Sequence, residues 1–373
     1  MLKKSTFALL VLICGAFCAS LLAYEPPKLE QEGGWTMCVI SDPQAYQRYS
    51  RNHGIFVLQT AWIAENLEKL NIQQVLCVGD LVESNNLQAV GDGRFANQTG
   101  DQMWKTVSHA FSYLDGKIPY IVTTGNHDYG KAVYPDGNHY GTRSSENRET
   151  QIDKYFPLDR NPSWKGVMVD AFENAYGKKT VENAAYEFTA PNGQKLLTIA
   201  LEFAPRPETI AWAKKLCERE AYRNHFVIIL THSYLWSTRE DNKRIPKENY
   251  GVNKAGGLAG QQIWEQLVYP TPNIRMVICG HHSTADNMDG CTGFRVDKNA
   301  AGKPCYQMLF DVQALGGGWE GNGGDGWLRL LEFSKDMKHV KVRTFSTLFA
   351  ISPTTRQFAW DHSKNCEFEF DIE

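Results

Sequence analysis

Side chains that commonly bind metals follow several apolar runs of the sequence, at the points where those runs end. They are Asp42 with Gln44, Asp80, Asn126 with His127 and Asp128, His232, and His281. Each is weak evidence alone, because an Asp after a strand is usually a helix cap and a buried His is usually a hydrogen-bonded core residue. Ligands of open α/β sheets, however, bind beyond the carboxyl ends of the strands, where several loops converge. The shared position of these residues therefore predicts one metal-binding site at a sheet edge.

Two of the histidines in the sequence are adjacent, in the stretch MVICGHHSTAD (276–286). Side chains alternate between faces along an extended chain, so neighbouring residues rarely enter the same coordination sphere. If the chain stays extended here, Ser283 shares a face with His281, and His282 points elsewhere. We therefore expect only His281 of the adjacent pair to bind a metal.

The elements that must position these residues are buried strands and amphipathic helices in alternation. Strand-like apolar runs occupy residues 35–41, 74–79, 118–125, 225–231 and 276–280. Apolar residues at helical spacing mark residues 58–70, 103–114 and 210–216, and the neighbourhood of 263–267. A hairpin is predicted over 184–203, around the turn Asn192-Gly193. This alternating order is typical of an α/β fold.

The rest of the chain is less regular. Residues 129–180 are rich in Gly, Asn, Arg and aromatic residues and are predicted to form an irregular insertion, whereas the part from 306 onward is rich in strands. No stretch resembles an interdomain linker, so we expect a single domain over residues 24–373.

The N-terminus has the layout of a secretory signal peptide. Lys3 and Lys4 precede an apolar stretch over 7–23, and Ser20 or Ala23 offers a small residue before a cleavage point. An uncleaved membrane anchor is the alternative, although the stretch is shorter than the roughly 20 residues that a spanning helix needs. We expect a signal peptide at 1–23 and an exported, periplasmic or extracellular protein without a membrane anchor after cleavage.

The composition excludes several kinds of partner. The chain has 373 residues and a formal net charge of -3, which gives no electrostatic basis for binding nucleic acid. We expect a monomer that acts on a small molecule.

Seven of the nine cysteines lie after the signal segment, which contains Cys14 and Cys18. Cys38, Cys77 and Cys279 sit within apolar runs and are expected to be buried thiols. Export permits disulfides, and Cys291 with Cys305 is the best candidate pair. No pair of CxxC motifs indicates a structural zinc.

The order and wording of the site segments resemble a known family. The segments are SDPQ (41–44), GDLVE (79–83), GNHD (125–128), TH (231–232) and GHHS (280–283). They resemble the calcineurin-like metallophosphoesterase signature, which runs D-x-H, G-D-x-x-[DEN], G-N-H-[DE], a lone H, and G-H-x-H. The sequences LEF (201–203) and GWLRLLEF (326–333) look like features of an exported bacterial subgroup with Asp-Pro-Gln in place of Asp-x-His. The fold that the resemblance implies is a four-layer α/β/β/α sandwich of two mixed sheets flanked by helices.

The resemblance also implies hydrolysis of a phosphoester, either a monoester or a diester, with two divalent metal ions. Metal one would take Asp42, Gln44 and Asp80, and metal two would take Asp80, Asn126, His232 and His281. Two ions bridged by one carboxylate can share a hydroxide that attacks phosphorus in line. His127 would be a general acid or stabilise transition-state charge, and Asp128 would orient His127 or its loop. A structural role for His127 is the alternative.

Two departures from the signature concern metal one. Gln44 stands where the family has the histidine of D-x-H, and Ser283 stands where it has the last histidine of G-H-x-H. The first site then has only oxygen donors, which suit Mn or Mg, whereas the histidine-containing site suits Mn, Fe or Zn. We expect an unsymmetrical pair in which metal one is the weaker.

Substrate contacts are expected from the segment after GNHD, where Arg143 could pair with a phosphate and His139 could approach the site. The alternative for both is a solvated surface loop. Trp319 lies in a glycine-rich run and would either stack on a sugar or base or pack in a turn.

Two rival functions stay open. One is a non-catalytic or weakly active ligand-binding protein on the same fold with an eroded first metal site. The other is a structural protein that binds carbohydrate.

Overall fold

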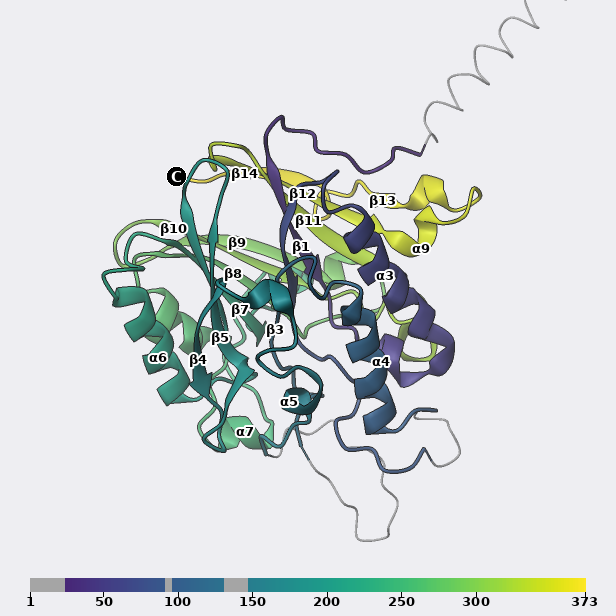
Figure 1. Ribbon diagram of the computed structural model, residues 1–373, viewed down its shortest axis with the longest axis horizontal. Helices are drawn as coiled ribbons and strands as arrows, with labels where there is room; N and C mark the ends of the chain where they lie inside the picture. Colours follow the sequence, from purple (N-terminus) through teal and green to yellow (C-terminus); the bar gives the residue numbers. More distant parts are fainter. Residues whose placement is uncertain (1–23, 91–95, 131–146) are drawn as a thin grey trace, which may run out of the picture.

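The computed structural model describes residues 24–90, 96–130 and 147–373. The predicted signal peptide at 1–23 lies outside the described residues, as do Arg143 and His139. The described chain forms an α/β fold of two mixed β-sheets that face each other, with helices on their outer faces (Figure 1). The four-layer α/β/β/α prediction is confirmed.

The first sheet contains seven strands among the described residues, in the order β13-β12-β11-β1-β2-β3, with β14 also pairing with β12. Their bounds are β1 Trp35–Ile40, β2 Ile72–Cys77, β3 Tyr120–Val122, β11 Trp327–Phe333, β12 His339–Ser346, β13 Trp360–Asp361 and β14 Phe368–Asp371. β1, β2 and β3 are parallel, so their carboxyl ends lie at one edge, whereas β11 runs antiparallel to β1.

The second sheet also contains seven described strands, in the order β4-β5-β6-β7-β8-β10-β9. Their bounds are β4 Met168–Glu173, β5 Lys179–Thr189, β6 Lys195–Ala200, β7 Phe226–Ser233, β8 Ile274–Gly280, β9 Thr292–Lys298 and β10 Pro304–Phe310. β6, β7, β8 and β10 are parallel neighbours. The ends of β7, β8 and β10 therefore lie side by side, which places their following residues in one row.

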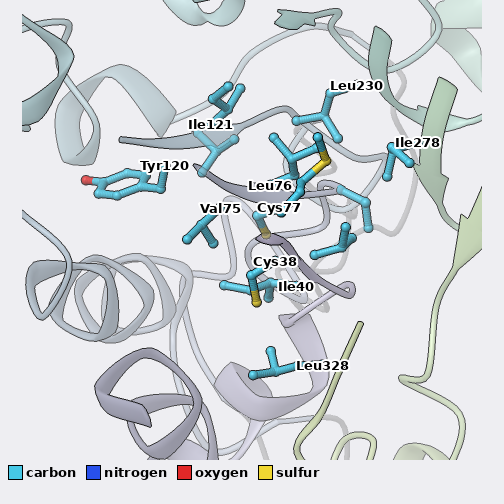
Figure 2. Packing of buried hydrophobic residues seen from close by; sticks show 14 of the residues in the cluster. Cys38, Ile40, Val75, Leu76, Cys77, Tyr120, Ile121, Leu230, Ile278 and Leu328 are labelled. Atoms are coloured by element: carbon cyan, nitrogen blue, oxygen red, sulfur yellow. The ribbon is translucent and has the colours of Figure 1, made fainter. Parts of the chain in front are cut away.

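The core between the sheets follows from the alternation of side chains along each strand. In β7, Ile228 and Leu230 belong to the cluster that contains Cys38 and Val75 of the first sheet, whereas Val227 and Ile229 belong to a separate cluster. Figure 2 shows side chains of both sheets, including Leu230 and Ile278, among those of the first cluster. Because both faces of β7 are buried, its sequence is apolar without alternation from Phe226 to Leu230.

Helices cover the outer faces of both sheets. α3 (His53–Glu65) and α4 (Gly100–Ser112) lie beside the first sheet, where Trp62 packs on Phe345 and Phe111 packs on Tyr120. α4 begins with a capping box between Thr99 and Gln102, which satisfies two backbone N–H groups at the helix start.

On the other side, α6 (Pro207–Glu218) packs Ile210, Ala213 and Leu216 on the second sheet. α8 (Gly260–Ile263) continues into the π-helix η4 (Trp264–Val268), in the neighbourhood where a helix was predicted. The short helices are α2 Gln44–Arg48, η1 Ser50–Asn52, α5 Ile152–Tyr155, η2 Pro162–Trp164, η3 Thr238–Glu240, α7 Gly251–Lys254, η5 Met288–Gly290, η6 Gly318–Glu320, α9 Thr347–Ala350 and η7 Arg356–Phe358.

The predicted irregular insertion is more regular than expected in its described part. It contains α5 and β4, and β4 adds an edge strand that pairs antiparallel with β5. The register between β4 and β5 shifts twice. Short, bulged edge strands lack a clean two-residue hydrophobic period, so the sequence pattern did not reveal this strand.

The expected disulfide between Cys291 and Cys305 is wrong, since both are free, buried thiols. β9 and β10 pair antiparallel with Cys305 opposite Asp297, and Cys291 lies six positions before Asp297 along the chain. At roughly 3.4 Å per residue this separates the two cysteines by about 20 Å, far beyond the reach of a disulfide. Cys38, Cys77 and Cys279 are buried thiols, as predicted.

Within the described ranges, no helix has both the length and the apolar character needed to cross a membrane.

Replacing Gly280 with Ala is expected to destabilise the fold where the two sheets meet. A Cβ atom at this position would lie 2.1 Å from Asp42 Oδ1 and 2.4 Å from Val78 Cγ2. Both neighbours are buried, so we expect a loss of about 1–3 kcal/mol in the free energy of unfolding, measured by urea denaturation.

The matched control is Gly54→Ala in α3, where no atom lies within 4 Å of the added Cβ. This variant should be as stable as the parent, or up to about 1 kcal/mol more stable, because Ala favours helix. Equal urea midpoints for the two variants would contradict this account of Gly280.

Candidate metal centre

The two sheets present the ends of their parallel strands to each other, and this brings the predicted site residues together. Asp42, after β1, accepts a hydrogen bond from the backbone N–H of His281, after β8, at 3.0 Å. Asp80, after β2, accepts one from the backbone N–H of His127 at 2.8 Å. Asp80 Oδ2 also lies 3.3 Å from Nε2 of His232 on β7. Residues up to 239 positions apart in the chain thus share one buried site.

Four ligand atoms converge on one point of this site. Asn126 Oδ1 lies 2.9 Å from His281 Nδ1 and 3.1 Å from His232 Nε2. The two imidazole nitrogens are 3.2 Å apart, and Asp80 Oδ2 is 3.3 Å from the His232 nitrogen. Ligands that surround a metal at about 2.0–2.2 Å have comparable mutual distances in a tetrahedral arrangement. The four residues assigned to metal two therefore fit a single transition-metal ion.

The hydrogen bonds on the far sides of the two imidazoles explain why these atoms need a cation. His232 Nδ1–H donates to the carbonyl of Val78 at 2.8 Å, and His281 Nε2–H donates to the Glu248 carboxylate at 3.1 Å. Each bond leaves a lone pair on the nitrogen that faces the site. Carboxylate, amide and imidazole lone pairs then point at one another, which is unfavourable until a cation lies among them.

The pKa shifts of the site residues agree with a cation site beside Asp80. Burial opposes ionisation of Asp80, but the imidazoles of His232 and His127 lower the pKa of its carboxyl below the usual range. Burial raises the pKa of Asp42 well above its ordinary value, and the nearby carboxylates of Asp311 and Asp80 raise it further. Burial disfavours protonation of His281, but the Glu248 carboxylate raises its pKa overall. Asp80 is thus the carboxylate most readily available as an anionic ligand.

Strained backbone positions two of these ligands. Asp80 has φ 48° and His281 has φ 78°, values in the left-handed region that non-glycine residues rarely adopt. The His282 N–H bonds to the Gly280 carbonyl at 3.0 Å, which forms a γ-turn around His281. The chain is therefore not extended from His281 to Ser283, as the expectation for the two faces had assumed.

The turn nevertheless separates the adjacent histidines. His282 lies against Trp236, with ring centroids 4.4 Å apart, and its Nδ1 accepts a hydrogen bond from Ser237 N at 3.3 Å. Its ring thus packs on the loop after β7, whereas the His281 ring faces Asn126 and His232. Ser283 and His281 both line one cavity.

His127 and Asp128 have different surroundings. His127 Nδ1–H donates to the Glu83 carbonyl at 2.8 Å, and Nε2 lies 3.9 Å from Asp80 Oδ2, on the side of the ligand atoms. The Asp128 carboxylate accepts backbone N–H bonds from Leu81, Val82 and Gly125 at 2.8–3.1 Å. Asp128 therefore joins the loops that carry Asp80 and Asn126. Of its two expected roles, orienting His127 or orienting the loop, these contacts correspond to the second.

The position expected for metal one is built differently. Gln44 Nε2 donates to Asp80 Oδ2 at 3.0 Å and to Gln313 Oε1 at 2.5 Å. Gln313 Nε2 donates to Asp42 Oδ2 at 3.2 Å and to Asp311 Oδ2 at 2.8 Å. Amide N–H groups thus face the carboxylates here, and as arranged these side chains do not fit a cation.

A cavity of about 310 Å³ opens onto the ligand atoms. It is lined by Asp80, Asn126, His127, Tyr250, His281, Ser283, Gln313 and Ala314. Tyr250 forms one wall, 6.0 Å from the His281 ring and edge-on to Phe203 at 5.3 Å. The lining residues include no Lys or Arg from the described ranges, and the predicted phosphate contacts Arg143 and His139 lie outside those ranges. The Trp319 side chain also lies outside what is described.

Four residues of the site were not found from the sequence: Glu248, Tyr250, Asp311 and Gln313. Asp311 directly follows the buried strand β10, so the strand-end criterion used for the other ligands would have found it. Gln313 follows β10 by three residues, the same offset as Asp80 after β2, so it shares this signal, whereas Glu248 and Tyr250 lie in a loop without periodicity.

Comparison with protein families supplies the identification. The family model for calcineurin-like phosphoesterases matches residues 36–283, which span the strand-end segments from SDPQ to GHHS. The chain belongs to the calcineurin-like phosphoesterase family. Most members of this family are phosphoesterases, and they typically bind two metals.

Among curated proteins, this calcineurin-like phosphoesterase is similar to YvnB of Bacillus subtilis (strain 168), whose name describes it as uncharacterized. The two are 30% identical over 317 residues, which cover 84% of this chain and 20% of YvnB. The chain thus spans about a fifth of the length of this relative.

Among solved structures, the chain is similar to GAP50, described as the anchor in the inner membrane complex of Plasmodium, with a TM-score of 0.39 and 11% identity. The match covers 91% of this chain and 89% of GAP50. Vacuolar Protein Sorting 29 from Cryptosporidium parvum matches with a TM-score of 0.29 and 10% identity, over 91% and 98% of the two chains. Similarities this weak carry no argument about the site.

Replacing Glu248 with Gln is expected to weaken metal binding by about 10- to 100-fold, because a carboxylate that accepts the far-side N–H of a ligating histidine orients the ring and raises its basicity. Calorimetric titration of the metal-free protein with Mn²⁺ measures this change.

Glu240→Gln is the matched control, since Glu240 lies 4.0 Å from Nδ1 of His282, the neighbouring histidine that packs on Trp236. Its Mn²⁺ dissociation constant should equal that of the parent. Equal effects of the two substitutions would show that Glu248 does not act through His281.

Proposed function

We propose that this protein hydrolyses a small-molecule phosphoester, a monoester or a diester, in a metal-dependent reaction. The observation that carries the proposal is the convergence of four lone-pair atoms beside His127 in a cavity open to solutes. Family membership supports it, because most calcineurin-like proteins are phosphoesterases.

The residues that would hold the metal are Asp80, Asn126, His232 and His281. Two imidazoles with two oxygens suit Mn, Fe or Zn. When bound, the metal supplies a Lewis acid that lowers the pKa of water and polarises a phosphoryl oxygen. Asp80 contributes the negative charge, and the Val78 carbonyl and Glu248 orient the imidazoles.

His127 is the proposed proton donor or charge stabiliser. Its Nδ1–H is held by the Glu83 carbonyl, so that Nε2 is directed toward the cavity side of Asp80. A protonated imidazole there would donate to a phosphoryl oxygen or to the leaving group. Asp128 acts through the loop backbone, not through the substrate.

The features of the N-terminal segment also suggest where the protein acts. We propose that the protein works as an exported monomer, in the periplasm or outside the cell, after removal of residues 1–23. Arg143 and His139 are the proposed contacts for the substrate phosphate, since both lie in the stretch 129–143 that directly follows GNHD.

Hydrolysis of an aryl phosphate and of a bis-aryl phosphate with added Mn²⁺ tests the proposed function. The parent protein should release the phenol from at least one of the two, and a chelator should abolish the reaction. Asn126→Ala should abolish it as well, because it removes one of the four ligand atoms. A protein that binds Mn²⁺ tightly but turns over neither ester would instead be the non-catalytic binding protein.

His127→Asn is expected to lower kcat by about 10²- to 10⁴-fold, since it removes the proposed general acid. Its Mn²⁺ content should stay that of the parent, because His127 is not among the four converging ligands.

His282→Asn is the matched control, as His282 packs on Trp236 away from the ligand atoms, and its kcat should be little changed. If both variants keep the parent kcat, the proposed role of His127 is wrong.

A further inference from the structure

We propose that the side-chain amides of Gln44 and Gln313 take the place of the first metal, so that this centre binds one metal ion per chain. The inference rests on the proposed function, because it concerns the same site, and it replaces the expected unsymmetrical pair with a mononuclear centre.

Every N–H of the Gln44 and Gln313 side-chain amides has an acceptor at this position. An amide nitrogen carries two donors. Those of Gln44 go to Asp80 Oδ2 and Gln313 Oε1, and those of Gln313 go to Asp42 Oδ2 and Asp311 Oδ2, over 2.5–3.2 Å. Asp80 Oδ2, Asp42 Oδ2 and Asp311 Oδ2 therefore already accept N–H groups within the protein. Among the described residues, Asp42 Oδ1, which lies beside Gly280, and Gln44 Oε1 have no hydrogen-bond partner.

Ser283, which stands where the family signature has its last histidine, also has partners within the protein. Ser283 Oγ accepts a hydrogen bond from Ala314 N at 3.3 Å and contacts Cys291 Sγ at 3.3 Å. The serine is thus engaged with the segment after β10. Gln313, from that same segment, lines the cavity, whereas Asp42 and Gln44 are fully buried.

The two sides of the Asp80 carboxylate differ in the hydrogen-bond donors and acceptors that face it. On the side of His232, each imidazole directs one N–H to an acceptor behind it, so the nitrogens that face Asp80 and Asn126 carry lone pairs, an arrangement that a cation stabilises. On the side of Gln44, donors face acceptors, and no cation is needed. The same carboxylate oxygen, Asp80 Oδ2, takes part in both arrangements.

The orientation of the Gln44 amide decides between one ion and two. With the amide reversed, Oε1 would face Asp80 Oδ2 and Gln313 Oε1, and three oxygens in contact would require a cation. In the orientation of the structure, Gln44 Oε1 has no hydrogen-bond partner among the described residues, whereas Nε2 has two. The metal content of the protein therefore reports directly on this proposal.

The test is metal analysis after equilibration with excess Mn²⁺ and gel filtration, for the parent, Gln44→Ala and Gln44→His/Ser283→His. We expect one ion per chain in the parent and in Gln44→Ala. In the double variant, which restores both histidines of the family signature, we expect two. Electron paramagnetic resonance should show isolated Mn²⁺ in the parent and an exchange-coupled pair in the double variant.

Two ions in the parent that fall to one in Gln44→Ala would overturn the proposal and leave the proposed function standing. No tightly bound ion in the parent would overturn both. Gln313→Ala repeats the test from the segment after β10, and it keeps the test decisive if Gln44→Ala does not fold; one ion is again expected.

Discussion

The carboxylate of Asp80 is the point on which the site depends, because it contacts groups from both sheets. Asp80 follows β2 of the first sheet, and its oxygens meet the backbone N–H of His127, the imidazole of His232 and the amide of Gln44. A buried carboxylate is costly unless charges or donors surround it. The left-handed backbone at Asp80 turns the side chain into that environment and adds strain of its own. The packed sheets on both sides hold this unfavourable combination in place.

The two sides of this carboxylate illustrate how one fold can accept or exclude a cation. Toward His232 and His281, the far-side hydrogen bonds to Val78 and Glu248 fix lone pairs inward. Toward Gln44, neutral amides direct N–H groups to the carboxylates. The two sides differ in whether the facing atoms are donors or acceptors, and the side of His281 also opens onto the cavity, whereas Asp42 and Gln44 are fully buried.

Much of the fold was predictable, because periodicity and strand-end residues are local signals. The buried strands and main helices were placed within a few residues, although α3 ends at Glu65, earlier than the apolar pattern suggested, while Leu70 beyond it still packs inward. The misses have physical causes. β4 is a bulged edge strand without a clean period. Cys291 and Cys305 are close in sequence, but the strand register sets them at opposite ends of a hairpin.

By itself, the sequence determined which residues could be ligands and in which family they belong, because the signature residues follow apolar runs that must become buried strands. Only the tertiary structure decided which atoms of those residues face one another. The hydrogen bond from the His281 N–H to Asp42, the Glu248 carboxylate behind the His281 ring, and the contact of Gln313 with Gln44 all join segments that are distant in the sequence. Local sequence carries no information about such contacts, since they depend on the register and packing of two sheets. The direction of each donor and acceptor is set there.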